Sequence, residues 1–313
     1  MRGIVEKTPD ARALARLFRA CFPGIVRKAS AAEAIFSHPG NRLLACQQDG
    51  AEAGVILWNG NVVLMLCVLP QYRGQGIGSA LLEALEARLA RAGAGEIRFC
   101  DGFSYLAPGI PIGEGEPAYA RNRAFFEKRG YRHSWGTEEC VDMAMSLSDF
   151  RDDGHRVGDE IRGVKYRFAG KEDMRRVLEC TDDGYPEFSP YYRNPSLYAG
   201  SPANGERVLI AETDGLVAGT LMVCFETEQP GLGSVGCTVT RPAYRNRGIA
   251  TTMVRLGTGE FRARGIPNAY LGYTYTQIVP MYARSGYSVS MRYFMGVKTL
   301  QKGSQNEGRM PHL

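Results

Sequence analysis

Two glycine-containing loops are the segments of this sequence whose residue types best suit binding chemistry. They read Arg73-Gly74-Gln75-Gly76-Ile77-Gly78 and Arg245-Asn246-Arg247-Gly248-Ile249-Ala250. A glycine turn that opens a helix points several backbone N–H groups at one place, and the helix dipole adds partial positive charge there. We therefore expect each loop to bind a diphosphate. A side chain at Gly76 or Gly248 should weaken that binding, because it would hold the phosphate away from the amides.

The spacing of the glycines separates these loops from two other phosphate-binding loops. A dinucleotide loop has glycines at its first, third and sixth positions, but the sixth position counted from Gly74 is Ser79. No strand-helix-strand unit with a ribose-binding acid precedes the loop, and neither loop ends in the Gly-Lys-Ser/Thr of a nucleoside-triphosphate site. The sequence therefore disfavours both alternatives.

The same order of elements surrounds both loops. A strand-like run, Val62 to Pro70 or Gly236 to Pro242, leads into the loop, and the apolar spacing after it becomes helical. The segments expected after the loops are strands Glu96 to Phe103 and Asn268 to Thr274, and short helices Phe125 to Tyr131 and Met281 to Tyr287, each ending in glycine and an aromatic residue. The segments expected before them are helices near Ala11 to Cys21 and Glu172 to Cys180, and hairpins that turn at Asp49-Gly50 and Asp214-Gly215.

This repetition predicts two domains. The chain has 313 residues, which suits two hydrophobic cores better than one. The polar segment from Ser148 to Asp159 lacks an apolar pattern and reads as a linker. We therefore place the domains at residues 1–150 and 156–300.

Composition and charge argue against several classes of partner. The net charge is +5, in a chain that is 44% hydrophobic and 23% charged, and the basic residues form no block. This balance suits an anionic cofactor and argues against nucleic acid. No apolar run approaches the roughly 20 residues that span a bilayer, and the N-terminus lacks a secretory signal, so we expect a cytoplasmic protein without a membrane partner. The eight cysteines have no close pair and no metal-ligand spacing, so no metal is expected.

Both loops resemble the cofactor loop of the GNAT acetyltransferase superfamily, which has the form Gln/Arg-x-x-Gly-x-Gly/Ala. The resemblance implies an α/β fold with mixed sheets, arranged as two consecutive acyl-CoA-binding domains, and acetyl-CoA as the cofactor. It also implies that the fourth and fifth strands of each domain splay apart around the pantetheine arm. The implied cofactor-binding residues are Leu66, Cys67, Val68, Arg73, Gly74, Gln75, Gly76, Ile77 and Gly78, and in the second copy Cys237, Thr238, Val239, Arg245, Asn246, Arg247, Gly248, Ile249 and Ala250.

The resemblance further implies a proton donor, usually a tyrosine four residues before the glycine of the glycine-aromatic corner. This position is Tyr282 in the second copy and Phe126 in the first, which has no proton to give. We therefore expect the C-terminal domain to be catalytic and the N-terminal domain to be non-catalytic or weakly active. Glu226 is a second catalytic candidate, because a carboxylate at the end of the third strand can attract an amine or take its proton through water. Glu228 lies beside it in the sequence.

The acceptor side is less determined. Tyr185, Glu187, Tyr191 and Tyr192 lie where the family often places acceptor contacts. The first copy carries an insert around residues 105–119, which we interpret as a surface loop.

Together these features predict an N-acetyltransferase that moves an acetyl group from acetyl-CoA to the primary amine of a small molecule, by direct transfer in a ternary complex. An amino sugar, an antibiotic and a metabolite amine all stay open as acceptors. Two alternatives stay open as well, a non-catalytic acyl-CoA sensor and an acyltransferase that uses a longer acyl-CoA. The sequence leaves a monomer and a homodimer equally open.

Overall fold

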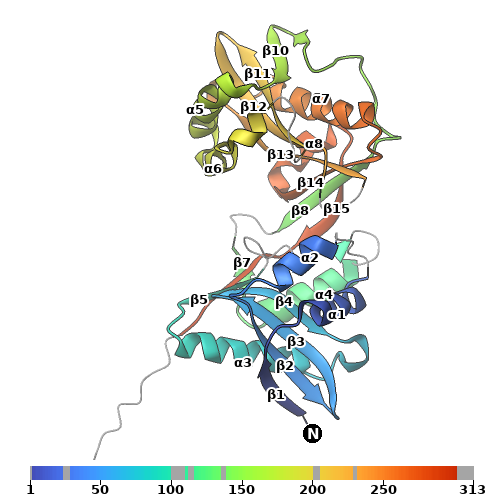
Figure 1. The fold of residues 1–313 in the computed structure, drawn as a ribbon, viewed down its shortest axis with the longest axis vertical. Helices are drawn as coiled ribbons and strands as arrows, with labels where there is room; N and C mark the ends of the chain where they lie inside the picture. Colours follow the sequence, from blue (N-terminus) through green and yellow to red (C-terminus); the bar gives the residue numbers. More distant parts are fainter. Residues whose placement is uncertain are drawn as a thin grey trace, which may run out of the picture. The chain divides into compact units, whose positions relative to one another are not determined.

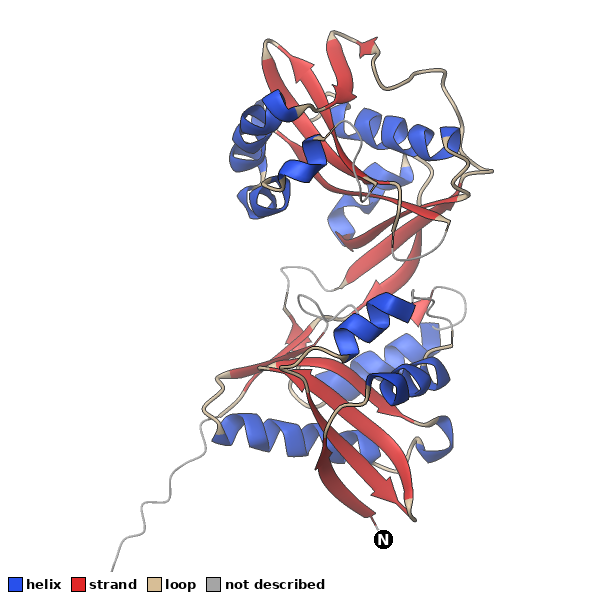
Figure 2. Cartoon of the chain, in the orientation of Figure 1, coloured by secondary structure: helices blue, strands red, loops and turns tan. Residues whose placement is uncertain are grey.

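The computed structural model describes residues 2–23, 29–99, 110–111, 116–134, 139–199, 205–227 and 231–301. It divides into two compact α/β units (Figures 1 and 2). The first unit comprises Met1–Glu139 together with Tyr293–Leu313, and the second comprises Cys140–Arg292. Within the described ranges, no helix combines the length and the apolar character needed to span a membrane.

The first unit is built on a mixed sheet with strand order β1-β2-β3-β4-β5-β16-β7. Its strands are β1 (Arg2–Lys7), β2 (Arg42–Gln48), β3 (Ala51–Asn59), β4 (Val62–Val68), β5 (Glu96–Phe99), β7 (Arg132–His133) and β16 (Gly296–Thr299). Its helices are α1 (Ala11–Cys21), α2 (Ala29–Phe36), α3 (Ile77–Arg91) and α4 (Glu116–Glu127), and β6 (Ile110–Pro111) is a two-residue strand. The helical apolar spacing after the first loop corresponds to Leu81, Leu82, Leu85 and Leu89, which are buried on α3. Asp10 caps α1 by accepting from the N–H groups of Arg12 and Ala13 at 2.9 and 3.0 Å.

The second unit contains a sheet in which β15-β8-β14-β13-β12-β11-β10-β9 are neighbours in that order. Its strands are β8 (Cys140–Ser146), β9 (Glu160–Ile161), β10 (Val164–Phe168), β11 (Glu206–Thr213), β12 (Leu216–Cys224), β13 (Leu232–Thr240), β14 (Asn268–Tyr275) and β15 (Ser288–Tyr293). Its helices are α5 (Met174–Gly184), α6 (Ser189–Tyr192), α7 (Ile249–Ala263) and α8 (Val279–Ala283). The predicted hairpins are present, with Asp49 and Asp214 at φ 52° and 53°, each followed by a left-handed glycine.

Two apolar cores lie on opposite faces of the second sheet (Figure 1). One packs α7 and α8 against the sheet and includes Met253, Phe261 and Tyr282. The other packs α5 and α6 and includes Val177 and Tyr192. Each face of the sheet therefore presents different side chains to any ligand that enters between the strands.

The compact units do not follow the linear ranges 1–150 and 156–300 that we predicted. Strand β8 belongs to the first range, yet it pairs with β14 in the second sheet. Strand β16 belongs to the second range, yet it pairs with β5 and β7 in the first sheet. Each strand fills an interior position of its sheet, and β8 is buried along most of its length, whereas in β16 only Gly296 and Val297 are buried. The polar segment at 148–159 marked an exposed stretch of chain rather than the crossing point between the units.

Candidate functional site

Both glycine loops have the geometry that their sequences indicate. Gly76 and Gly248 are the N-caps of α3 and α7, with φ 76° and 81°. A second left-handed residue precedes each of them, Gly74 at φ 77° and Asn246 at φ 62°. The first hydrogen bond within each helix runs from the N–H of Ala80 to the carbonyl oxygen of Gly76 at 3.1 Å, and from the N–H of Thr252 to the carbonyl oxygen of Gly248 at 2.9 Å. The N–H groups of the preceding turn are those that a helix leaves without an internal partner, and they are available to an anion.

The arginine that begins each loop makes the same contacts in both units. In the first unit the Arg73 guanidinium donates to the carbonyl oxygens of Val68 at 3.1 Å and Cys21 at 3.2 Å. In the second unit Arg245 donates to Thr240 at 3.2 Å and Gly184 at 2.9 Å. Each arginine therefore ties the end of the central strand to the end of the first long helix and holds the loop in place, while the backbone amides face the ligand position.

Strands β13 and β14 separate in the middle of the second sheet. Their parallel pairing joins Leu232 with Asn268, Gly233 with Ala269 and Ser234 with Tyr270. Beyond Ser234, no further pair forms between these two described strands. A cavity of about 680 Å³ lies where they diverge. Its lining includes eight of the predicted cofactor-binding residues and the predicted proton donor, namely Cys237, Thr238, Val239, Arg245, Asn246, Gly248, Ile249, Ala250 and Tyr282. The fold thus brings the second loop and the predicted proton donor to one cavity.

A bulge in β13 shapes the centre of this cavity. The register with β12 shifts, so Cys237 and Thr238 lie opposite the single residue Leu221. Cys237 has φ 47°, which is unusual for a residue with a side chain. Its carbonyl accepts a hydrogen bond of 2.6 Å from the hydroxyl of Tyr192, a fully buried side chain. Because the bulge interrupts the strand ladder, it leaves main-chain groups beside the cavity for a ligand. Sequence reasoning missed this role of Tyr192.

Tyr282 borders the same point from the α7–α8 face. Its side chain is 5% exposed, and its hydroxyl lies 3.0 Å from Thr238 Oγ1. Burial raises the pKa of the Tyr282 phenol, so the group stays protonated at neutral pH. Burial also raises the pKa of the Cys237 thiol to about 12, so this cysteine is a neutral lining residue rather than a thiolate nucleophile.

The predicted acceptor residues occupy different environments. Tyr185 lines the cavity, Tyr192 is buried behind it, and Tyr191 is 60% exposed. Glu226 follows β12, is exposed, and is not among the residues that line the cavity, so its role as a base stays a prediction. Glu228 and most of the first unit's insert lie outside the described residues. Within the described ranges, no group of three or more His, Cys, Asp or Glu could hold a metal.

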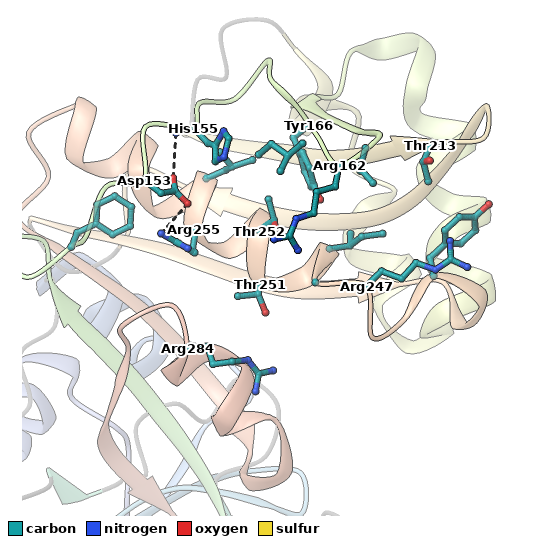
Figure 3. Close-up of a pocket in the computed structure, with 17 residues that line it drawn as sticks. Asp153, His155, Arg162, Tyr166, Thr213, Arg247, Thr251, Thr252, Arg255 and Arg284 are labelled. Carbon is teal, nitrogen blue, oxygen red and sulfur yellow. Dashed lines mark hydrogen bonds and ion pairs between the residues drawn. The ribbon is translucent and has the colours of Figure 1, made fainter.

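A second cavity, of about 450 Å³, lies along the first turns of α7 and shares Tyr244, Gly248, Ile249, Thr251 and Arg284 with the first. Figure 3 shows the guanidinium groups that gather around it, from Arg162, Arg247, Arg255 and Arg284. Arg255 is paired with Asp153 at 2.9 Å. The remaining guanidinium groups make this side of the α7 N-terminus electropositive. The sequence had indicated Arg247 alone, because Arg162 and Arg284 lie on distant segments.

The first unit differs from the second at the corresponding positions. Strand β4 pairs with β3 in unbroken register from Met65 to Val68, and its register shift lies at Leu64, farther from the loop than the bulge of β13. Phe126 takes the place of Tyr282 and stacks on Phe99 at 4.1 Å. The ring of Phe125 lies 3.6 Å from the position of a Cβ at Gly78, at the start of α3. Aromatic side chains therefore occupy the space that the second unit leaves beside its loop.

Comparison with known families identifies a domain in each half of the chain. Residues 6–100 match the model described as the acetyltransferase (GNAT) domain, and residues 173–287 match the acetyltransferase (GNAT) family. No curated protein matches the chain.

Solved structures share the two-unit fold at low sequence identity. A GCN5-related N-acetyltransferase from Sphaerobacter thermophilus has TM-score 0.66 and 21% identity, with 95% of this chain and 96% of that one covered. A tandem GNAT protein from the clavulanic acid biosynthesis pathway has TM-score 0.64 and 16% identity, with 96% and 99% covered. A glucosamine N-acetyltransferase region of a fungal multidomain β-N-acetylglucosaminidase has TM-score 0.71 and 16% identity over 95% of this chain, which spans 38% of the fungal protein's length.

Proposed function

The chain belongs to the GNAT acetyltransferase family, with one domain of that family in each half, and on this premise we propose that it transfers an acetyl group from acetyl-CoA to the primary amine of a small molecule. The observation that carries the proposal is the cavity between β13 and β14. It joins the loop at the N-terminus of α7, the bulge at Cys237 and the hydroxyl of Tyr282.

The described residues fit acetyl-CoA. The amides between Asn246 and Ala250 suit its diphosphate, and the arginines of the second cavity suit the phosphate on its nucleotide. The opening between β13 and β14 suits the pantetheine arm. Acetyl-CoA supplies an acetyl group activated as a thioester, and the chain must orient it, stabilise charge on its carbonyl oxygen and provide a proton.

The chain's own groups divide these tasks. Main-chain N–H groups at the Cys237 bulge are placed to donate to the thioester carbonyl oxygen, as in an oxyanion hole. With acetyl-CoA bound, an amine nitrogen would bond to the acetyl carbon as the carbon–sulfur bond breaks, and Tyr282 would give its hydroxyl proton to the departing sulfur. The proton released by the amine would pass to water, from which the Tyr282 phenolate would regain a proton. Thr238, 3.0 Å from the phenol oxygen, orients that hydroxyl.

The first unit lacks the parts that this chemistry needs. Phe126 has no proton to give, the register shift of β4 lies at Leu64 rather than beside the loop, and the ring of Phe125 packs against Gly78 at the start of α3. We therefore assign catalysis to the second unit and a structural or ligand-binding role to the first.

The test is release of free CoA thiol from acetyl-CoA in the presence of primary amines, with wild-type protein and the variants Gly248→Val and Gly76→Val. We expect turnover that Gly248→Val abolishes and Gly76→Val retains. Turnover lost only with Gly76→Val would place the reaction in the first unit. Absence of thiol release with every amine, in protein that binds acetyl-CoA, would favour the sensor alternative.

A further inference from the structure

The α5–α6 face of the cavity between β13 and β14 is lined by aromatic rings. Tyr185 and Phe188 lie on the turn after α5, with ring centroids 4.5 Å apart. Tyr275 ends β14, and its hydroxyl lies 3.3 Å from that of Tyr185, so the two sides of the opening meet there. Ile278, which also lines the cavity, is 39% exposed, and Tyr191, whose ring centroid lies 6.3 Å from that of Phe188, is 60% exposed.

This face is opposite the one from which Tyr282 and the α7 loop line the cavity. Tyr185 and Phe188 pack against the α5–α6 core, and Tyr282 belongs to the α7–α8 core. A group attached to the cofactor on one face can therefore meet an acceptor that enters from the other. The aromatic residues are the first side chains that such an acceptor would touch.

Negative charge is scarce at this entrance. None of the described residues that line the cavity is Asp, Glu, His or Lys. Two nearby acids are engaged, since Asp183 pairs with Arg241 at 3.2 Å and Asp182 accepts from the Ser189 hydroxyl. Burial, the Tyr185 hydroxyl and the charge of Glu187 together raise the pKa of Tyr275 to about 12, so the Glu187 carboxylate contributes negative charge to this entrance.

These properties discriminate among amine classes. A polyamine or an aminoglycoside brings several ammonium groups, which need several carboxylates, and no carboxylate is among the described residues that line the cavity. A sugar brings many hydroxyl groups, which lose their water unless the lining replaces it. A flat apolar ring packs well on aromatic faces, and one ammonium can be held by those faces and one carboxylate.

We propose that the acceptor is a monoamine carried on a flat apolar body, of the arylalkylamine class, held by Tyr185, Phe188 and Tyr275. The inference rests on the proposed function, because it names the acceptor of the same reaction. It assigns Phe188 as the residue that selects the acceptor through its ring.

The probe is 2-phenylethylamine, compared with spermidine and glucosamine. Calorimetry of the full chain saturated with CoA measures binding of each amine, and thiol release from acetyl-CoA measures turnover. We expect kcat/KM for 2-phenylethylamine to exceed that for the other two amines at least tenfold. Phe188→Ala should raise its Kd and KM by about tenfold, because the ring face is lost, and Phe188→Tyr, which keeps a ring, should restore both.

The two readouts separate this inference from the proposed function. If 2-phenylethylamine binds through the Phe188 ring but no thiol is released, the proposed transferase function is refuted and the proposed ligand class is retained. If the protein turns over spermidine or glucosamine in preference, the transferase function is retained and the arylalkylamine acceptor is refuted. Failure of 2-phenylethylamine to bind, or binding unchanged in Phe188→Ala, overturns the acceptor class.

Discussion

Replacing Tyr282 by phenylalanine removes one oxygen atom and leaves the ring in place. The phenol lies 3.0 Å from Thr238 Oγ1 and is 5% exposed, and its ring packs 6.3 Å from that of Tyr287. Loss of one neutral hydrogen bond should lower the free energy of unfolding by about 1 kcal/mol. Loss of a positioned general acid should lower kcat by about 10²- to 10³-fold, which corresponds to roughly 3–4 kcal/mol in the activation barrier.

The assay is thiol release at saturating acetyl-CoA and amine, with denaturant unfolding measured in parallel. The KM for acetyl-CoA should stay within about twofold, because the loop at Gly248 is unchanged. Tyr287→Phe is the matched control. Its hydroxyl is also buried and bonded, at 2.8 Å to Thr258, but it does not line the cavity. The control should lose similar stability and keep its kcat. If Tyr282→Phe turns over at the wild-type rate, the proton does not come from this phenol and the mechanism is refuted.

Three other predictions test the fold and the site. Asp173, whose side chain is 1% exposed, pairs with Arg167 at 2.6 Å and Arg176 at 3.1 Å, so Asp173→Asn should lower the free energy of unfolding by about 2 kcal/mol at pH 7. Because hydrogen bonds from Arg167 lower the Asp173 pKa, this contribution to stability is present above the usual aspartate pKa and is lost as the pH falls below it; equal stability of variant and wild type at pH 7 would contradict this. A chain split at residue 155 should leave two fragments that co-purify when expressed together, because β8 and β16 each complete the other fragment's sheet; two separately soluble monomers on gel filtration would disprove the exchange. Iodoacetamide at pH 8 should alkylate Cys237 on the order of a thousandfold more slowly than free cysteine, because burial raises its pKa to about 12, and peptide mapping that finds rapid labelling would exclude a neutral thiol.

The elements that sequence could predict are those fixed by local chemistry. The loops were identifiable because left-handed turns at Gly76 and Gly248 need glycine and because helices follow them. Tyr282, which lines the same cavity as the second loop, was predicted from the resemblance to the GNAT family, which implies a tyrosine four residues before the glycine of the glycine-aromatic corner. Hairpin turns and the buried face of α3 followed from turn residues and apolar spacing.

The features that escaped prediction depend on contacts between distant segments. Strands β8 and β16 carry no motif that says which sheet they join, and β16 is fixed by a distant contact, the ion pair of Lys298 with Glu86 at 2.6 Å. The bulge at Cys237 is held by Tyr192, 45 positions away in the sequence. The bonds from Arg245 to two carbonyls could not be read from a motif that suggested phosphate contact. Arg162 reaches the α7 cavity from a hairpin whose sequence carries no such signal.

The most direct test of the central claim is calorimetric titration of the intact protein with acetyl-CoA, together with Gly248→Val. Gly248 has φ 81° and a Cβ there would meet nothing within 4 Å, so the substitution acts on the loop conformation and on the space before the amides rather than on packing. We expect saturable binding to the wild type that falls at least about thirtyfold in Gly248→Val, a loss of roughly 2 kcal/mol. No binding to the folded wild type, or equal affinity in the variant, would contradict the assignment of this loop as the diphosphate site.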